Sequence, residues 1–319
     1  MGFMIEHWDF STPIATQEVT TEVTTSQDIK AKHWYHCERL HPDIRGWLEQ
    51  NQVPKATVDH LLADESRPSF HPLDDENFML ILRGINMNEN ASPEDMLSIR
   101  ILYFQGALIS TRKIPSRAIM EIRQALAEQK GPKSLASLLN QIIEGLNGKI
   151  DLYLDTIEET LNHFDVNDES TYKHISAQKA LISIKRFIRP QQYAIRDLLE
   201  SNSDLVVSRP HQYRFAHNNI TRINETIDFY LGEVALFQEE IKHNRDDKTN
   251  KNSYLFTLVA TIFLPTSFLT GLLGINIGGM PGVDSSTAFI WFCVALIIIF
   301  GLEWLLLKRF GLTNKNDNE

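Results

Sequence analysis

Cysteine and basic charge are both scarce in this sequence of 319 residues. The two cysteines, Cys37 and Cys293, lie in segments of different kind, one mixed and one strongly apolar, so we expect no disulfide between them. Nothing therefore indicates an oxidising compartment. Lys and Arg number 31 against 41 Asp and Glu, which gives a net charge of −10. This acidic balance argues against nucleic acid as a partner and suits a surface that attracts cations.

Sequence signals of catalysis and of secretion are also missing. The sequence contains no Walker motif, no nucleophile elbow and no histidine-rich metal helix, so we expect that the protein is not an enzyme. The first residues, MGFMIEHWDF, lack a basic region followed by an apolar core. We therefore expect no cleavable signal peptide.

Charge disappears altogether between Lys251 and Asp284. The apolar run 254–274 would span roughly 30 Å as a helix, about the hydrocarbon thickness of a bilayer. A second run, 288–307, is of similar length and contains a single charged residue, Glu303. We predict two transmembrane helices, at about residues 253–275 and 287–307, joined by a short loop over residues 276–286.

The first of these helices carries a row of mostly small or mildly polar side chains, which we call the small-residue stripe. On a seven-residue repeat it consists of Ser253, Thr257, Ala260, Leu264, Ser267 and Gly271, and Gly274 continues it. One interpretation is a helix-packing face, because small side chains let helices approach closely in lipid. The other is the lining of a water-filled pore. One chain has too few helices to enclose a pore, so the second interpretation needs an oligomer.

The end of this helix resembles a known family. The segment PTSFLTGLLGINIGGMPG, Pro265–Gly282, is similar to the signature of the CorA superfamily of divalent-metal channels and transporters, in which Gly-x-Asn ends the first of two C-terminal helices. Magnesium channels of that superfamily usually carry Gly-Met-Asn and an acidic loop. This sequence has Gly-Ile-Asn and a neutral loop, which resembles the zinc-transporting ZntB branch. Two further segments, LADESRPS from Leu62 and RPQQY from Arg189, are similar to the same family, and the resemblance covers essentially the whole chain.

The resemblance implies both an architecture and a pore. The expected fold is a cytosolic α/β sandwich, a long helical stalk and two C-terminal transmembrane helices, assembled as a funnel-shaped homopentamer. Five copies of the small-residue stripe would then line the pore, and Gly274, Ile275 and Asn276 would form its selective entrance. A ring of Asn276 carboxamides could hydrogen-bond the water shell of a hydrated cation. Leu264 would make an apolar constriction, and Asp284 in the loop would attract cations.

Charged residues beside the membrane segments predict the orientation. Lys242, Arg245, Lys248 and Lys251 precede the first segment, and Lys308, Arg309 and Lys315 follow the second. The loop between the segments has no basic residue. The positive-inside rule then places both termini in the cytosol and the Asn276 loop outside. We expect a multi-pass protein of the bacterial inner membrane.

Residues 1–130 mix strand and helix signals and predict a cytosolic α/β domain. Strands are expected at 18–25, 34–38, 77–84 and 98–111, the last as a hairpin that turns at Gln105-Gly106. Short helices are expected at 43–50 and 55–63. His33, His36, Cys37 and His41 are close enough in sequence to suggest a zinc site. A strand would send His36 and Cys37 to opposite faces, however, and we favour a strand with a structural histidine.

Residues 131–252 read as a helical stalk or funnel, and residues 253–319 as the transmembrane domain. Between Pro210 and Pro265 there is no proline and a single glycine, so one long helix is predicted to run into the membrane, where neighbouring hydroxyls would help to accommodate Pro265. An apolar seam on it, Ile220 to Ile241, requires a partner helix from this chain or from a neighbour. An earlier helix, expected to begin at Lys133, has an acidic far end, which is either a solvated face or a surface that attracts cations; its acidic residues are Asp151, Asp155, Glu158, Glu159, Asp165 and Asp168.

The functional prediction is transport of divalent cations, zinc preferred, with proton coupling that the resemblance implies. A CorA-type magnesium or cobalt channel is the alternative, and a membrane-anchored scaffold or sensor that transports nothing is an alternative of another class. Expected partners are copies of this chain, lipids and divalent metal ions, and no nucleic acid. No cofactor is expected beyond transported Zn²⁺ and a regulatory Zn²⁺ whose position is left open. Glu303, inside the membrane, suits a pairing with Lys308 or Arg309, or a role with protons.

Overall fold

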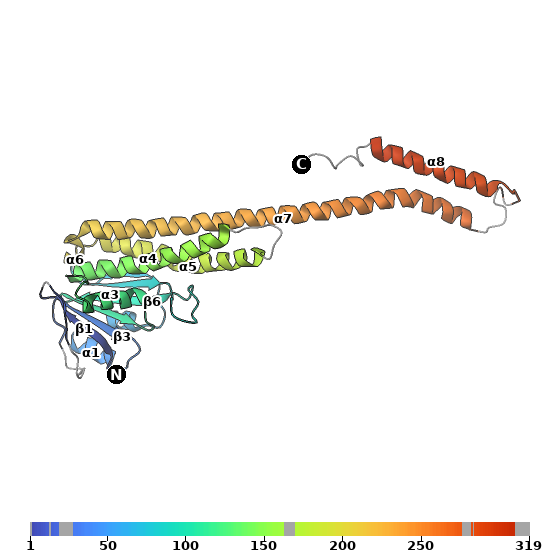
Figure 1. Cartoon of the computed structure of the whole chain (residues 1–319). Helices are drawn as coiled ribbons and strands as arrows, with labels where there is room; N and C mark the ends of the chain where they lie inside the picture. Colours follow the sequence, from blue (N-terminus) through green and yellow to red (C-terminus); the bar gives the residue numbers. More distant parts are fainter. Residues whose placement is uncertain are drawn as a thin grey trace. The chain divides into compact units, whose positions relative to one another are not determined.

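A computed structural model describes residues 2–12, 14–18, 28–162, 170–275, 282 and 284–309. The chain divides into two compact units, Met1–Phe237 and Gln238–Glu319. The first unit contains a sheet and most of the helices, and the second contains two apolar helical segments (Figure 1). The expected α/β sandwich with a long helix and an apolar C-terminal helix is confirmed.

The first unit is built on a seven-stranded mixed sheet with the order β2-β1-β3-β7-β6-β5-β4. Strands β3 and β7 pair in parallel, and every other neighbouring pair is antiparallel. Three of the expected strands are present, and the expected strand at 18–25 lies largely outside the described residues. The strands are β1 (Met4–Asp9), β2 (Thr16–Gln17), β3 (His33–Glu38), β4 (Ser69–Pro72), β5 (Phe78–Gly84), β6 (Leu97–Phe104) and β7 (Ala107–Arg112).

The hairpin between β6 and β7 turns at the two residues that the sequence indicated. Gln105 and Gly106 have φ values of 50° and 74°. Positive φ at both central residues defines a type I′ turn, whose twist matches that of the flanking strands. The hairpin aligns Phe104 with Ala107 and thereby sets the register of the whole β6–β7 pair.

Each face of the sheet is covered by helices, because its strands are apolar on both sides. Helices α1 (Asp43–Gln50) and α2 (Lys55–Leu62) cover one face, where Trp47 and Leu61 are fully buried. The other face packs against α3 (Arg117–Ala127), α4 (Leu135–Asn162) and α5 (Ser170–Leu199). A four-residue helix, α6 (Asp204–Val207), follows α5.

Helix α5 passes through Pro190 without ending. The next residue, Gln191, is fully buried and belongs to the RPQQY segment. The helix therefore accepts proline here while the chain around it is held by tertiary contacts.

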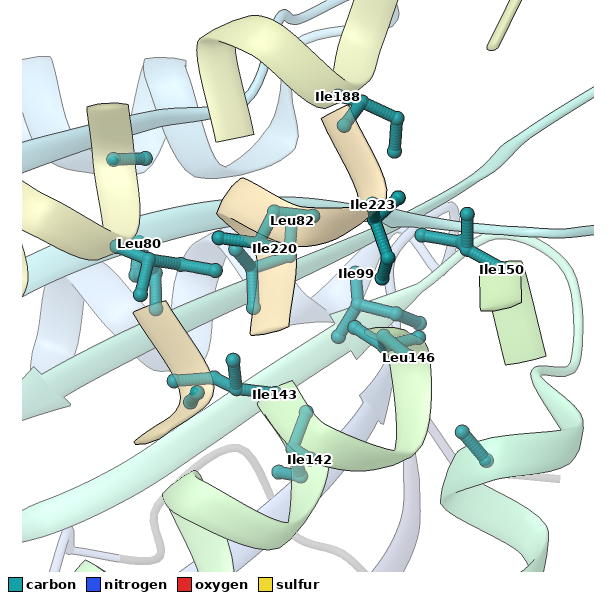
Figure 2. Packing of buried hydrophobic residues seen from close by; sticks show 14 of the residues in the cluster. Leu80, Leu82, Ile99, Ile142, Ile143, Leu146, Ile150, Ile188, Ile220 and Ile223 are labelled. Atoms are coloured by element: carbon teal, nitrogen blue, oxygen red, sulfur yellow. The ribbon is translucent and has the colours of Figure 1, made fainter. Parts of the chain in front are cut away.

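Helix α7 runs from Pro210 to Gly274, and its N-terminal half packs on α4 and α5. Its seam residues Ile220 and Ile223 meet Leu146 of α4, Ile188 of α5 and residues of β5 and β6 in one apolar cluster (Figure 2). The partner of the seam, which the sequence left open, is therefore this same chain for the buried part from Ile220 to Val234.

A buried chain of polar groups joins the sheet to three helices at this interface. The Arg83 amide of β5 donates to Gln191 Oε1 at 2.7 Å, and Gln191 Nε2 lies 3.4 Å from Asn147 Oδ1 of α4. Asn147 Nδ2 in turn donates to the Ala216 carbonyl of α7 at 3.3 Å. Both amide side chains are fully buried. Loss of one of these hydrogen bonds would therefore leave a buried polar group unpaired, and that cost exceeds the net stabilisation that the hydrogen bond itself provides.

Replacing Gln191 by leucine should therefore destabilise the first unit. The substitution leaves the Arg83 amide and Asn147 Oδ1 without their partner, at an expected cost of about 2–3 kcal/mol. In thermal unfolding of the full chain in detergent, Tm should fall by several degrees. Gln192→Leu is the matched control, because Gln192 is only half-buried and bonds the Thr221 hydroxyl. Equal losses in the two variants would contradict the role assigned to the buried chain.

Candidate functional site

The second unit contains the two segments that are long and apolar enough to cross a membrane. They are the C-terminal part of α7, which ends at Gly274, and α8 (Ala288–Arg309). Their most hydrophobic windows have mean hydropathies of 1.8 and 2.5. Large apolar side chains such as Phe256, Phe263 and Trp291 are exposed on them, as expected for surfaces in contact with lipid.

The less exposed residues of the two segments form one face on each helix. On α7 they are Tyr254, Leu258, Ile262, Pro265, Thr266 and Leu269, and on α8 they are Ala288, Phe292, Cys293, Leu296, Ile299, Glu303 and Leu307. Both sets repeat every three or four residues, which is the period of one helix face. On each helix the residues of reduced exposure therefore lie on one side, which we call its covered face.

The small-residue stripe lies on a different face of α7. All six residues from Ser253 to Gly271 are exposed in the single chain, and Leu264 is 69% exposed. At 100° per residue, the centre of the stripe is roughly 150° around the helix from the face that includes Leu258 and Ile262. The stripe is therefore on the side of α7 opposite to its covered face, and it is available to other copies of the chain.

Hydroxyl groups along this segment bond to the helix itself. Thr257 Oγ1 donates to the Ser253 carbonyl at 2.9 Å, and Thr261 and Thr270 bond to carbonyls one turn earlier. Beside Pro265, which lacks an amide hydrogen, Thr266 Oγ1 lies 3.2 Å and 3.0 Å from the carbonyls of Ile262 and Phe263. Because each hydroxyl donates to a carbonyl of its own helix, these polar side chains add little free-energy cost in an apolar environment. Each hydroxyl oxygen keeps a lone pair that can accept a hydrogen bond at the helix surface.

The residues expected at the pore entrance are only partly described. Gly274 is the last residue of α7, and Ile275 follows it with 49% exposure. Asn276, the residue on which the entrance hypothesis depends, lies outside the described residues. Asp284 is described and exposed, in keeping with a carboxylate open to solvent.

Glu303 is unusual because its carboxylate is covered. Both of its oxygens are buried and have no hydrogen-bond partner among the described residues, and the same holds for the Tyr254 hydroxyl of α7. Among the described residues, Glu303 forms no ion pair with Lys308 or Arg309. A covered carboxylate in a membrane helix is a candidate for proton chemistry.

The acidic end of α4 is partly neutralised. Asp151 Oδ2 accepts from Arg222 Nη2 of α7 at 2.6 Å, so this carboxylate joins two helices. Asp155 and Glu158 farther along are exposed. The solvated-face interpretation fits these described residues.

The histidines and the cysteine around β3 do not come together as one cluster. His36 Nδ1 lies 2.8 Å from the Ser110 hydroxyl in the core, and Cys37 points into the opposite core against Tyr35. Burial lowers the pKa of His36 to about 3, with Arg112 and Arg123 acting in the same direction, and burial raises the pKa of the Cys37 thiol. The structural role expected for a histidine here is confirmed for His36.

His33 has different neighbours, which the sequence did not indicate. Its side chain lies near Glu18 and His7, and these residues are far apart in sequence and adjacent only through strand pairing. Burial lowers the pKa of His7 to about 4, although the Glu18 carboxylate opposes the shift. His7 is therefore a neutral imidazole at physiological pH.

Comparisons with known proteins agree with this architecture. The family described as CorA-like Mg2+ transporter protein matches residues 30–309. The zinc transport protein ZntB of Vibrio parahaemolyticus is 88% identical over 319 residues, which is 100% of both chains. The divalent cation transporter CmaX of Pseudomonas aeruginosa is 27% identical over 285 residues, which is 86% of each chain.

Solved structures extend the comparison to three dimensions. The crystal structure of the ZntB cytoplasmic domain from Vibrio parahaemolyticus matches with a TM-score of 0.75 and 89% identity, and covers 77% of this chain and 100% of that one. The full-length CmaX structure matches with a TM-score of 0.79 at 24% identity, over 96% and 97% of the two chains, which shows the fold alone. The chain therefore belongs to the ZntB branch of the CorA superfamily, a family of membrane transporters and not of enzymes.

Proposed function

We propose that this protein carries divalent cations, with zinc preferred, across the bacterial inner membrane through the centre of a homopentamer. The observation that carries the proposal is the 88% identity with a zinc transport protein over the full length of both chains. The match extends over the whole chain and so includes both membrane segments.

The arrangement of the second unit supports a pore on the axis of an oligomer. The small-residue stripe faces away from the side of α7 that is covered within the unit, so copies of α7 can turn it toward a common axis. Small and mildly polar side chains there leave room for water and a hydrated ion between the copies. Stripe residues would then line the pore from Ser253 to Gly271. The Leu264 side chains, one from each copy, would form its apolar constriction.

The stripe contains hydroxyls but neither carboxylates nor thiolates. Such a lining suits a hydrated cation in transit better than a tightly bound one, since zinc is held by imidazole, thiolate or carboxylate ligands. Asn276 at the entrance would hydrogen-bond the water shell, and Asp284 would raise the local cation concentration. Basic residues Lys308 and Arg309 in the last turn of α8 support a cytoplasmic position for both termini.

Flux measurements test the function and its alternatives together. Full-length protein in liposomes that contain a zinc-sensitive dye should admit zinc, and an inward proton gradient should increase the rate. Asn276→Ala should lower the flux at least about tenfold if the carboxamide ring selects hydrated cations, by analogy with the loss of one well-placed polar group. Magnesium flux driven by membrane potential alone would instead favour the CorA-type channel. Absence of any flux would favour a scaffold or sensor.

Cysteine cross-linking tests the position of the stripe. In a Cys293→Ala background, Ala260→Cys and Ser267→Cys should form disulfide-linked dimers on mild oxidation, because equivalent residues would meet around the axis. Leu258→Cys and Ile262→Cys, on the covered face of the same helix, are matched controls and should stay monomeric on denaturing gels. Cys37 can remain, since it is fully buried. Efficient linkage at positions 258 and 262 alone would contradict the proposed pore.

Glu303→Gln tests the origin of proton coupling. The amide keeps the size of the side chain and cannot exchange a proton at neutral pH, so zinc flux should persist but lose its response to the proton gradient. Asp284→Asn, which removes an exposed carboxylate outside the apolar segment, should retain that response. An unchanged proton response in Glu303→Gln would show that Glu303 is not the coupling residue.

A further inference from the structure

One group of potential metal ligands converges within the described residues, and it lies in the sheet of the first unit. His7 of β1, Glu18 just after β2 and His33 of β3 each offer a ligand atom within 4.8 Å of the other two. Of the four residues that the sequence suggested as a zinc site, His33, His36, Cys37 and His41, only His33 belongs to it.

The strand register explains why these side chains meet. In the β1–β3 pair, His7 is opposite Tyr35 and Asp9 is opposite His33, so His7 and His33 are diagonal neighbours on one face. On the other side of β1, the Glu18 amide donates to the His7 carbonyl at 3.0 Å. Three adjacent segments therefore direct side chains to one point near the β2 edge of the sheet.

The orientation of His33 leaves one ring nitrogen for a ligand. His33 Nδ1 lies 2.9 Å from the Ala31 carbonyl, which can only accept, so Nδ1 carries the hydrogen. His33 Nε2 then faces Glu18 Oε1 at 3.5 Å and Asp9 Oδ1 at 3.7 Å. Metal-bound histidines commonly donate their other N–H to a backbone carbonyl in this way, which fixes the ring.

His7 is a buried polar side chain that lacks a well-aligned partner. It is fully buried and stacks on Tyr35 with a centroid distance of 4.3 Å. Neither ring nitrogen makes a hydrogen bond of acceptable geometry, although Nδ1 lies 3.1 Å from Glu18 Oε2. His7 Nδ1 and Glu18 Oε2 are thus close to each other but do not form a well-aligned hydrogen bond. This is the arrangement of two atoms that bind the same metal ion. An unsatisfied buried imidazole is otherwise costly.

We propose that His7, Glu18 and His33 bind a resident zinc ion, with Asp9 available as a fourth ligand. Zinc bonds of about 2.0–2.2 Å in a tetrahedral site separate neighbouring ligand atoms by about 3.3–3.5 Å. The observed separations of 3.1 Å and 3.5 Å need little adjustment to reach that range. Two imidazoles with a carboxylate favour zinc over magnesium, which prefers oxygen ligands alone.

The bound ion would hold the edge of the sheet together. Within the part of the chain that the structure describes, β2 has two residues and pairs with β1 alone, so its own hydrogen bonds provide little to keep it in place. A zinc ion would connect the segment after β2 to β1 and to β3. This site is separate from the transport path proposed above and does not depend on it.

Zinc binding to the full-length protein tests the proposal. Protein in detergent would be stripped with a chelator and titrated with zinc against a chromophoric competitor, and Co²⁺ would then serve as a spectroscopic probe of the ligand field. Glu18→Gln and His33→Gln should each weaken the tightest site about tenfold or more, or lose one zinc per chain. His211→Gln removes an exposed histidine at the start of α7 and should bind zinc as the original chain does. The pore residues are unchanged in all these variants, so any zinc held there is common to them.

Glu18→His separates a metal ligand from a simple ion-pair partner. Imidazole can replace carboxylate on zinc, so this variant should bind zinc more tightly than Glu18→Gln and should retain a cobalt spectrum of low coordination number. Equal affinity in these two variants would overturn the proposal, as would an unchanged zinc affinity and stoichiometry in Glu18→Gln. If His33→Gln fails to fold, the two Glu18 variants decide the question, because the Glu18 side chain is 39% exposed and tolerates replacement.

Discussion

The first unit depends on the burial of one face of α7 against α4 and α5. Ile220, Ile223 and Ile227 are fully buried there, and burying each such side chain contributes roughly 1.5–3 kcal/mol. These helices also cover the sheet, so a shift of α7 along its axis would disturb a core that continues into β5 and β6 (Figure 2). The hydrogen-bonded chain through Gln191 and Asn147 makes this apolar contact specific. Its buried amides find all their partners in only one alignment of β5, α4, α5 and α7.

The membrane part of the same helix obeys a different rule. In lipid, association of apolar side chains with one another provides no hydrophobic free energy. The faces of a membrane helix therefore differ in function through the size and polarity of their side chains. On α7 the larger residues Leu258 and Ile262 lie on the covered side, and the small residues Ala260 and Ser267 lie on the opposite side. A helix with two such faces suits a position between an outer helix and a central axis, which is the arrangement proposed for the oligomer.

The histidines of the first unit show how burial and neighbours separate similar residues. His36 is satisfied by Ser110 inside the core and has a structural role. His7 is equally buried but has a misaligned carboxylate beside it, and His33 presents a free ring nitrogen to two carboxylates. Residue type alone does not distinguish these three, because the difference lies in what each adjacent strand contributes.

Much of the architecture could be predicted from the sequence because local patterns carried it. Apolar length without charge identified the two membrane segments, Gln105-Gly106 identified the hairpin turn, and a stretch with no proline and a single glycine identified the long helix. The small-residue stripe was also visible as a repeat, since a helix converts spacing directly into a face. Strand pairing, in contrast, joins residues by register and not by spacing. Only the tertiary structure therefore brought Glu18 and His7 to His33 and showed that the α7 seam packs within its own chain.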